Sequence, residues 1–364
     1  MEIQKETIGI LTYHNTQNFG AALQCFALYS ACSNAGKYVE IINYRNQYIE
    51  QSKGKKNRSL IKDLVQKPLF CQRKKAFENF NSLMTFSYKC YDRKKILADP
   101  PKYDKYIVGS DQVWSYKING GDTTYLLDFV ESPNKFTFAS SFGVSTLPKD
   151  LVREFKENLK GFQYISVRES TGVNLLREID VKGAVVVNDP VFLLSKSEWI
   201  KALNLKNNST NKKVFSYFLD HHTRQMFENN FNYKNKMMTK LSGGIKLKDF
   251  ISPNVSVDFS RGPAEFLEEL NSADIIYTDS FHATVFSIIM EKPFIVFLRG
   301  DEGKDSRIIN VLKMFGLEKC IYKEGIDINY IPNLDYNVIR SSVDEAREHN
   351  VSSLYNNILN VKVK

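Results

Sequence analysis

The stretch TIGILTYH (7–14), NTQNFG (15–20), AALQCFALYSACSNAGK (21–37) and VEIINY (39–44) decides the fold class. Its first and last pieces are rich in β-branched and apolar residues, which predicts two strands. The piece between them has apolar residues at helical spacing and a glycine stop at Gly36, which predicts a helix. A strand, a polar turn, a helix and a second strand make a βαβ unit, and such units build parallel sheets.

The same alternation continues along the chain and restarts after a polar, Asn/Lys-rich stretch at 195–212, which we interpret as a linker. We therefore predict an α/β protein with two Rossmann-like domains facing a cleft. The predicted divisions are an N-terminal, acceptor-side domain at 1–200 with a basic helical insert at 46–95, a C-terminal domain at 210–340, and a last helix at 341–364.

Length and composition exclude several classes of protein. The chain has 364 residues, of which 43% are hydrophobic, so a sizeable core is available. Five scattered cysteines are too few for a disulfide framework or a zinc site. The first residues do not resemble a signal peptide, and no apolar run reaches 18 residues. We expect a soluble, cytoplasmic protein.

The net charge of +9 is concentrated in residues 53–95, which hold thirteen Lys/Arg and three Asp/Glu. This segment lacks any nucleic-acid recognition motif, so we expect no nucleic-acid partner. Residues 58–84 can form an amphipathic helix with a break at Pro68. The predicted apolar face comprises Leu60, Ile61, Leu64, Val65, Leu69, Phe70, Phe77 and Phe80. Its basic residues would attract an anionic membrane or a phosphorylated lipid carrier; the alternative is a solvated helix packed on the N-terminal domain.

Familiar catalytic motifs are absent from the sequence. It contains no P-loop, no GxGxxG after the first strand, no GxSxG and no HExxH. His221 and His222 are adjacent in a predicted loop, which is poor metal-ligand geometry. We expect no metal site and no cofactor.

Polar loops follow several predicted strands, and in parallel sheets ligands bind at these strand ends. The loops are GSDQVW (109–114), SSFG (140–143), SVRES (166–170), NDP (188–190) and TDSFHA (278–283). Arg168 and His282 stand where a strand passes into a helix, and a helix N-terminus favours a bound anion. Structural alternatives exist for both: Arg168 can pair with Glu169 or another strand-end carboxylate, and His282 can be a histidine of the first helical turn.

Six strings occur in order: NFGAALQ (18–24), GSDQVW, ASSFGV (139–144), SVRES, NDPVFLL (188–194) and DSFHATVFSIIMEKPFIVF (279–297). Together they resemble the polysaccharide pyruvyl transferase family over roughly residues 8–318. The resemblance implies a fold like the two-domain B-type glycosyltransferases. It also implies transfer of the pyruvyl unit of phosphoenolpyruvate to two hydroxyls of one sugar, which forms a cyclic ketal during synthesis of bacterial surface polysaccharide, such as capsule or exopolysaccharide. The family's acceptors are commonly assembled on a lipid diphosphate at the cytoplasmic leaflet.

The resemblance also suggests roles for individual residues. An imidazole is a suitable acid for protonating C3 of phosphoenolpyruvate, so we assign His282 as general acid and Arg168 as the main anion clamp. Asp111 would orient or deprotonate an acceptor hydroxyl, or else cap the following helix. The remaining expected substrate contacts are Asn18 and Gly20 on the acceptor side, Ser141, Gly143, Ser280 and Phe281, with Arg307 as a second anion site or a surface arginine.

Two other functions are compatible with this pattern. A glycosyltransferase of the same fold would bind a nucleotide sugar instead of phosphoenolpyruvate. A non-catalytic scaffold is the second, and the presence of both Arg168 and His282 disfavours it.

Overall fold

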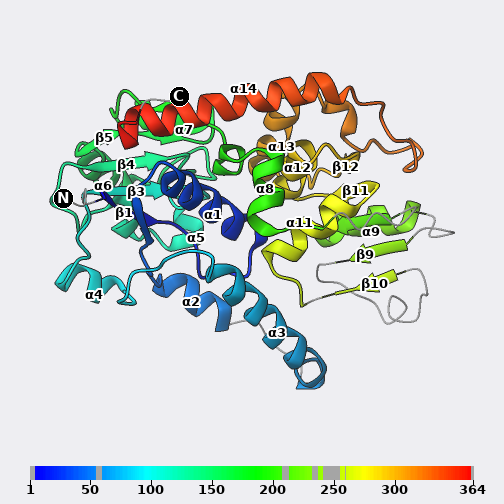
Figure 1. The fold of residues 1–364 in the computed structure, drawn as a ribbon, viewed down its shortest axis with the longest axis horizontal. Coiled ribbons are helices and arrows are strands. Elements are labelled where there is room, and N and C mark those ends of the chain that lie inside the picture. Colours follow the sequence, from blue (N-terminus) through cyan, green and yellow to red (C-terminus); the bar gives the residue numbers. More distant parts are fainter. Residues whose placement is uncertain are drawn as a thin grey trace. The chain divides into compact units, whose positions relative to one another are not determined.

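The structure is a computed structural model, and it describes residues 5–54, 60–206, 213–231, 237–240, 255–258 and 260–361. The chain packs into two compact units. The first unit contains residues 1–60, 81–194 and 346–364, and the second contains 61–80 and 195–345. Each unit is built on its own five-stranded parallel sheet (Figure 1).

The sheet of the first unit has the strand order β2-β1-β3-β4-β5. Its strands are β1 (Thr7–Leu11), β2 (Tyr38–Ile41), β3 (Lys105–Gly109), β4 (Lys135–Phe138) and β5 (Phe162–Tyr164). A short parallel pair, β6 (Ser166–Val167) and β7 (Val185–Val186), follows. The helices of this unit are α1 (Phe19–Asn34), α2 (Gln47–Gly54), α4 (Arg93–Ala98), α5 (Tyr116–Asn119), α6 (Lys149–Leu159), α7 (Ser170–Glu178) and the 3₁₀ turns Thr123–Leu126 and Pro190–Leu193.

The sheet of the second unit has the order β10-β9-β8-β11-β12, with the first strand in the centre. Its strands are β8 (Lys213–Tyr217), β9 (Met237–Lys240), β10 (Val255–Val257), β11 (Ile275–Thr278) and β12 (Phe294–Val296). The helices are α3 (Leu60–Asn81), α8 (Lys196–Leu203), α9 (His221–Asn230), α11 (Pro263–Ser272), α12 (Phe281–Ile289), α13 (Glu302–Met314) and the 3₁₀ turn Glu318–Cys320. Helix α14 (Tyr336–Leu354) and a π-helical turn, Tyr355–Leu359, end the chain.

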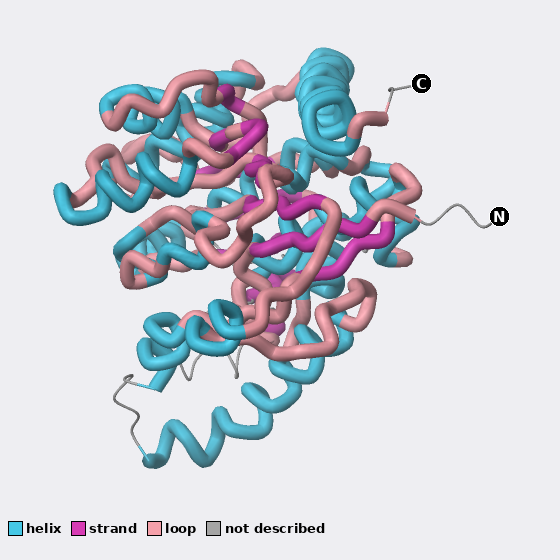
Figure 2. Tube along the Cα trace, turned by 90° about the vertical axis from the view of Figure 1, so that its left-hand side faces the viewer, coloured by secondary structure: helices cyan, strands magenta, loops and turns pink. Residues whose placement is uncertain are grey.

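Burial explains why these sequences form parallel sheets. All five residues of β3 and all four of β11 are buried, which a strand covered by helices on both faces requires. Helices flank the strands in Figure 2, and α12 has seven buried residues among its nine. The predicted parallel α/β class is confirmed. None of the helices among the described residues combines the length and apolar character needed to cross a membrane.

Helix α3 is the main departure from the predicted division of the chain. We expected the insert 46–95 to belong to the N-terminal domain, but residues 61–80 pack with the second unit. Phe77 and Phe80 are buried, and a Cβ added to Gly262 would lie 2.9 Å from the carbonyl oxygen of Ala76. The helix also runs through Pro68, where we had predicted a break. Residues 81–95 of the same basic segment remain with the first unit.

The predicted linker at 195–212 is wrong for its first half. Residues Lys196–Leu203 form α8, which begins with a capping box between Ser195 and Glu198. Trp199 is fully buried and meets Phe286 edge to face, with ring centroids 5.1 Å apart. One large aromatic residue thus anchors a helix whose other residues are mostly polar. The rest of the predicted linker, 207–212, lies outside the described residues.

Removing this anchor tests the packing. We expect Trp199→Ala to lower the free energy of unfolding of the second unit by about 3–5 kcal/mol, the usual cost of emptying a large aromatic site. Trp114, buried in the first unit, is the only other tryptophan, so its fluorescence reports the first unit while circular dichroism follows both. The control Lys201→Ala changes an exposed residue of the same helix. Equal unfolding curves for both variants would show that α8 does not depend on Trp199.

Candidate active site

The strand order gives each sheet a topological switch point, and ligands of open parallel sheets bind at such points. In the first unit, β2 lies on one side of β1, and β3 and the later strands lie on the other, so the switch point is between β1 and β3. In the second unit, the switch point is between β8 and β11 for the same reason. Gln24 of α1 bridges the first of these points. Its side chain donates to Thr12 Oγ1 (3.0 Å) and accepts from the backbone N–H of Ser110 (3.1 Å).

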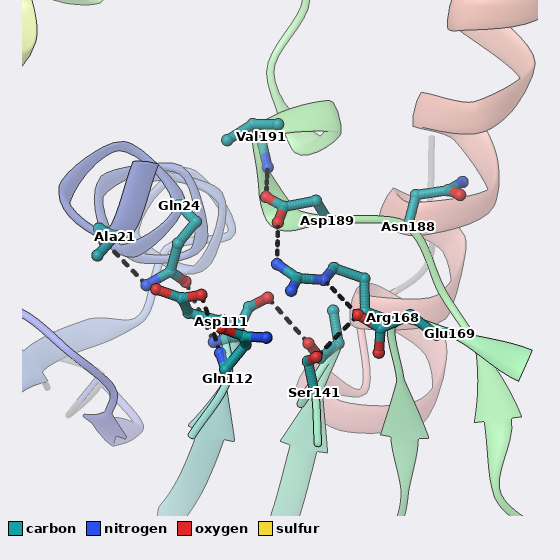
Figure 3. A network of polar contacts seen from close by, with 12 residues as sticks. Ala21, Gln24, Asp111, Gln112, Ser141, Arg168, Glu169, Asn188, Asp189 and Val191 are labelled. Carbon is teal, nitrogen blue, oxygen red and sulfur yellow. Dashed lines mark hydrogen bonds and ion pairs between the residues drawn. The ribbon is translucent and has the colours of Figure 1, made fainter. Parts of the chain in front are cut away.

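Arg168 directly follows β6, and its side chain is only 3% exposed. Its Nη1 donates to Asp189 Oδ2 (2.8 Å) and its Nε to Glu169 Oε1 (3.1 Å) (Figure 3). Asp189 is fully buried and also accepts from the backbone N–H of Val191 (3.2 Å). The structure therefore shows the ion pairs that the structural alternative anticipated for Arg168.

Charge balance around Arg168 favours its protonated form. Burial alone would lower the pKa of the guanidinium, but the nearby carboxylates of Glu169, Asp189 and Asp111 outweigh burial and raise the pKa. Among the described residues, one cation thus lies close to three carboxylates, whose negative charge stabilises its protonated form.

The structure brings Asp111, Ser141 and Gly143 together beside Arg168. Ser141 Oγ donates to Glu169 Oε1 (2.7 Å), and the backbone N–H of Ser141 donates to the carbonyl of Asp111 (3.0 Å). Asp111 has a positive φ of 65° and accepts from the N–H of Gln112, so it does not cap the following helix. Gly143 has a φ of +61°, and a Cβ at this position would lie 2.0 Å from the side-chain amide nitrogen of Gln112. Both observations explain why this residue is a glycine.

Asn18 and Gly20 stand at the start of α1. Asn18 is exposed and caps the helix, because its side chain accepts from the N–H of Ala21 (3.2 Å). Gly20 is buried in the first turn. This placement leaves the Asn18 side chain within reach of solvent at the end of β1, and the predicted acceptor contact of both residues stays a prediction.

In the second unit, Asp279 holds the loops at the switch point. Its buried carboxylate accepts from the backbone N–H groups of Leu219 (2.7 Å) and Asp220 (2.8 Å) and from Thr223 Oγ1 (2.8 Å). These donors belong to the loop after β8 and the start of α9. His221 and His222 are the first residues of that helix, not of a loop as predicted.

The predicted motif residues gather at the start of α12. Ser280 is the N-cap, and its Oγ accepts from the N–H of Ala283 (3.4 Å). The ring of Phe281 meets His282 edge to face at 5.2 Å, and the Arg307 guanidinium lies 5.7 Å from the Phe281 ring centre. His282 is half-buried. Arg307 therefore belongs to the same cluster as His282, although it comes 25 residues later.

Arg299 is a charged residue of this cluster that sequence reasoning missed. It follows β12, and its Nη2 donates to the carbonyl oxygen (2.7 Å) and to Oδ1 (3.2 Å) of Asp279. Asp305 fixes the loop by accepting from the backbone N–H groups of Arg299 (2.9 Å) and Gly300 (2.8 Å). Its position directly after a strand was the available signal. Across the described parts of the chain, no His, Cys, Asp and Glu side chains group as a metal site would require.

The model of the polysaccharide pyruvyl transferase family matches residues 18–301, which include every motif of both strand-end clusters. The chain belongs to the polysaccharide pyruvyl transferase family. The predicted family is thus confirmed over most of the chain. No curated protein sequence matches it.

A solved structure with a TM-score above 0.5 shows the fold, and two further structures are similar over nearly the whole chain. A Listeria monocytogenes protein assigned as a UDP-N-acetylglucosamine 2-epimerase is 9% identical with a TM-score of 0.51, over 97% of this chain and 95% of that one. The UDP-GlcNAc 2-epimerase of Neisseria meningitidis, bound to UDP-GlcNAc, is 12% identical with a TM-score of 0.47 over 98% and 100%. Anabaena Alr3699/HepE with UDP and glucose is 9% identical with a TM-score of 0.48 over 98% of both chains. This pyruvyl transferase family member has the Rossmann-like units of the B-type glycosyltransferase fold, as predicted.

The ion pairs of Arg168 make its removal costly even without substrate. We expect Arg168→Ala to lower the free energy of unfolding of the first unit by about 3–5 kcal/mol, because the buried Asp189 and the partly buried Glu169 lose their cation. Urea denaturation in a Trp199→Phe background, with Trp114 fluorescence as the probe, measures this unit. Arg177→Ala, an exposed arginine of α7, should change stability by less than about 0.5 kcal/mol. Wild-type stability of Arg168→Ala would contradict a structural role and favour the anion clamp.

Proposed function

We propose that the protein transfers the pyruvyl group of phosphoenolpyruvate to two hydroxyls of one sugar, forming a cyclic ketal and releasing phosphate. Membership in the polysaccharide pyruvyl transferase family carries this proposal. The clustering of Ser280, Phe281, His282 and Arg307 at the carboxyl edge of the second sheet supports it. The proposal includes no metal and no redox cofactor.

The chemistry assigns one proton transfer to His282. Protonation of C3 of phosphoenolpyruvate makes C2 electrophilic, and one sugar hydroxyl then forms a bond to C2 as its own proton leaves. The C–O bond to phosphate breaks, inorganic phosphate departs, and the second hydroxyl closes the ketal at C2 with loss of its proton. An imidazole, whose ordinary pKa lies near neutrality, is suited to the first step. The packing of His282 against Phe281 would hold its ring in place.

The first unit supports the acceptor side of the proposal. Its strand-end cluster contains Asp111, Glu169 and Asp189 around one arginine, and carboxylates accept hydrogen bonds from sugar hydroxyls. We propose that Asp111 orients or deprotonates an acceptor hydroxyl, with Asn18, Gly20, Ser141 and Gly143 contributing to the same side. The acceptor is a saccharide, and a lipid-linked intermediate is the form we propose.

His282→Ala tests the catalytic assignment. We expect turnover to fall about 10²- to 10⁴-fold, the usual contribution of positioned acid catalysis, while phosphoenolpyruvate still raises the thermal unfolding midpoint. Phosphate release with a mixture of candidate saccharides measures turnover. His349→Ala, an exposed histidine of α14, is the control and should keep wild-type activity. Undiminished turnover of His282→Ala would refute the proposed acid.

A thermal-shift scan with phosphoenolpyruvate and nucleotide sugars separates the proposal from its main alternative. Ligands that bind only the native state raise the midpoint. A shift with a uridine or guanosine diphosphate sugar, and none with phosphoenolpyruvate, would favour a glycosyltransferase of the same fold.

We also propose that the basic helix α3 brings the enzyme to the anionic cytoplasmic face of a membrane. Phe77 and Phe80 are buried, so this part of the helix offers charge and not an apolar face. Lys74 and Lys75 are exposed, and Lys74 also pairs with Glu78 at 3.5 Å. Such attraction is worth about 1 kcal/mol per basic residue near the surface and is screened by salt.

Vesicle sedimentation checks this attraction. We expect the protein to pellet with anionic but not with neutral vesicles, to be released by high salt, and to bind less when Lys74 and Lys75 are both changed to Glu. Lys201→Glu, at an exposed position of α8, is the control for a changed surface charge away from α3. Equal sedimentation with both kinds of vesicle, or none with either, would reject the membrane role without affecting the ketal chemistry.

A further inference from the structure

We propose that Arg299 is the cation that holds the anionic oxygens of the donor substrate. The inference rests on the proposed function and names a donor-binding residue outside the motifs that identify the family. Arg299 would bind a phosphate or carboxylate group, as in phosphoenolpyruvate. The diphosphate of a nucleotide sugar presents the same chemistry, so the experiment below treats these two sources separately.

The hydrogen bonds of Arg299 leave one amino group of its guanidinium available. Its Nη2 donates twice to Asp279, to the carbonyl oxygen at 2.7 Å and to Oδ1 at 3.2 Å, so both N–H groups of Nη2 are used. Its Nε is buried and has no hydrogen-bond partner among the described residues. Its Nη1 makes no hydrogen bond to the described residues either. The two N–H groups of Nη1 can therefore donate to the oxygens of a phosphate or carboxylate.

The direct ion pairs of Arg299 differ from those of Arg168. Arg168 contacts two carboxylates, Glu169 and Asp189. Arg299 contacts one, the carboxylate of Asp279, which is shared with three uncharged donors from residues 219, 220 and 223. The backbone hydrogen bond from Thr223 lowers the pKa of Asp220, and the charge of Arg299 lowers it further. Asp305 accepts from backbone N–H groups of the same loop as Arg299. Arg299 is therefore held by one direct carboxylate contact where Arg168 is held by two.

Topology supports the same assignment. Asp279 follows β11 and bonds to the loop after β8, so Arg299 is attached to the switch point of the second sheet, where ligands of this architecture bind. The carbonyl that it holds belongs to the residue three positions before His282. The guanidinium of Arg307 lies over the ring of Phe281, which belongs to the same motif. Two guanidinium groups thus lie around the segment that carries the proposed acid.

Isothermal titration of the full chain with phosphoenolpyruvate, UDP and inorganic phosphate tests the proposal. We expect Arg299→Ala to lower the affinity for phosphoenolpyruvate about 10- to 100-fold, because charge-assisted hydrogen bonds are lost. Arg299→Lys keeps the charge and a donor for Asp279 but loses the planar guanidinium. Its affinity for phosphoenolpyruvate should therefore lie between those of the wild type and Arg299→Ala. Arg340→Ala, which removes an exposed arginine paired with Glu291 in the same unit, should bind as wild type. Thermal midpoints measured without ligand show which variants fold. If Arg299→Ala does not fold, the affinity of Arg299→Lys for phosphoenolpyruvate tests the proposal.

The outcomes separate this inference from the proposed function. Wild-type affinity in the folded Arg299 variants, with a large loss in Arg168→Ala, would overturn the inference and leave the pyruvyl transfer intact. If the wild type binds UDP but not phosphoenolpyruvate, and the Arg299 variants lose affinity for UDP, the proposed donor is overturned and Arg299 remains the anion site. Failure of the wild type to bind any of the three anions would overturn both.

Discussion

A fully buried aspartate paired with an arginine fixes the strand-end loops in each unit. In the first unit Asp189 holds Arg168 and the N–H of Val191; in the second, Asp279 holds Arg299 and the loop after β8. A buried carboxylate is costly unless donors surround it, so the loops must converge on it. This requirement sets the positions of the loops that carry the candidate active-site residues before any ligand binds.

The two pairs differ in their charge balance, and the difference has chemical consequences. Glu169 adds a second carboxylate to Arg168, and Asp111 adds a third negative charge nearby, so the first cluster is acidic as a whole. Arg299 pairs directly with one aspartate, which also accepts from uncharged donors. A backbone hydrogen bond, together with the charge of Arg299, lowers the pKa of Asp220. Under the proposed function, the first environment would receive hydroxyl groups and the second an anion. In that proposal the two arginines differ through their partners, because both follow a strand end.

Much of the fold could be predicted from the sequence, because strands buried on both faces are continuous apolar runs and helices keep their period. Predictions failed where a tertiary contact overrides local composition. Half of residues 196–203 are polar, and they form a helix that the capping box of Ser195 and Glu198 and the burial of Trp199 stabilise. Helix α3 runs through Pro68 and packs with the second unit, where Gly262 gives room for its backbone. Neither contact has a local signal.

The candidate site shows the same division between local and distant information. Ser280, Phe281 and His282 form one turn at a helix start, so a short motif was enough to place them together. Arg168 was also visible in the sequence, but its commitment to Asp189, 21 residues later, depends on how the strands are paired. Arg299 and Asp279 are likewise 20 residues apart and meet only because β11 and β12 are neighbours. A motif arginine at a strand end is therefore insufficient to identify an anion site, since its capacity for a ligand depends on which carboxylates already neutralise it in the folded chain.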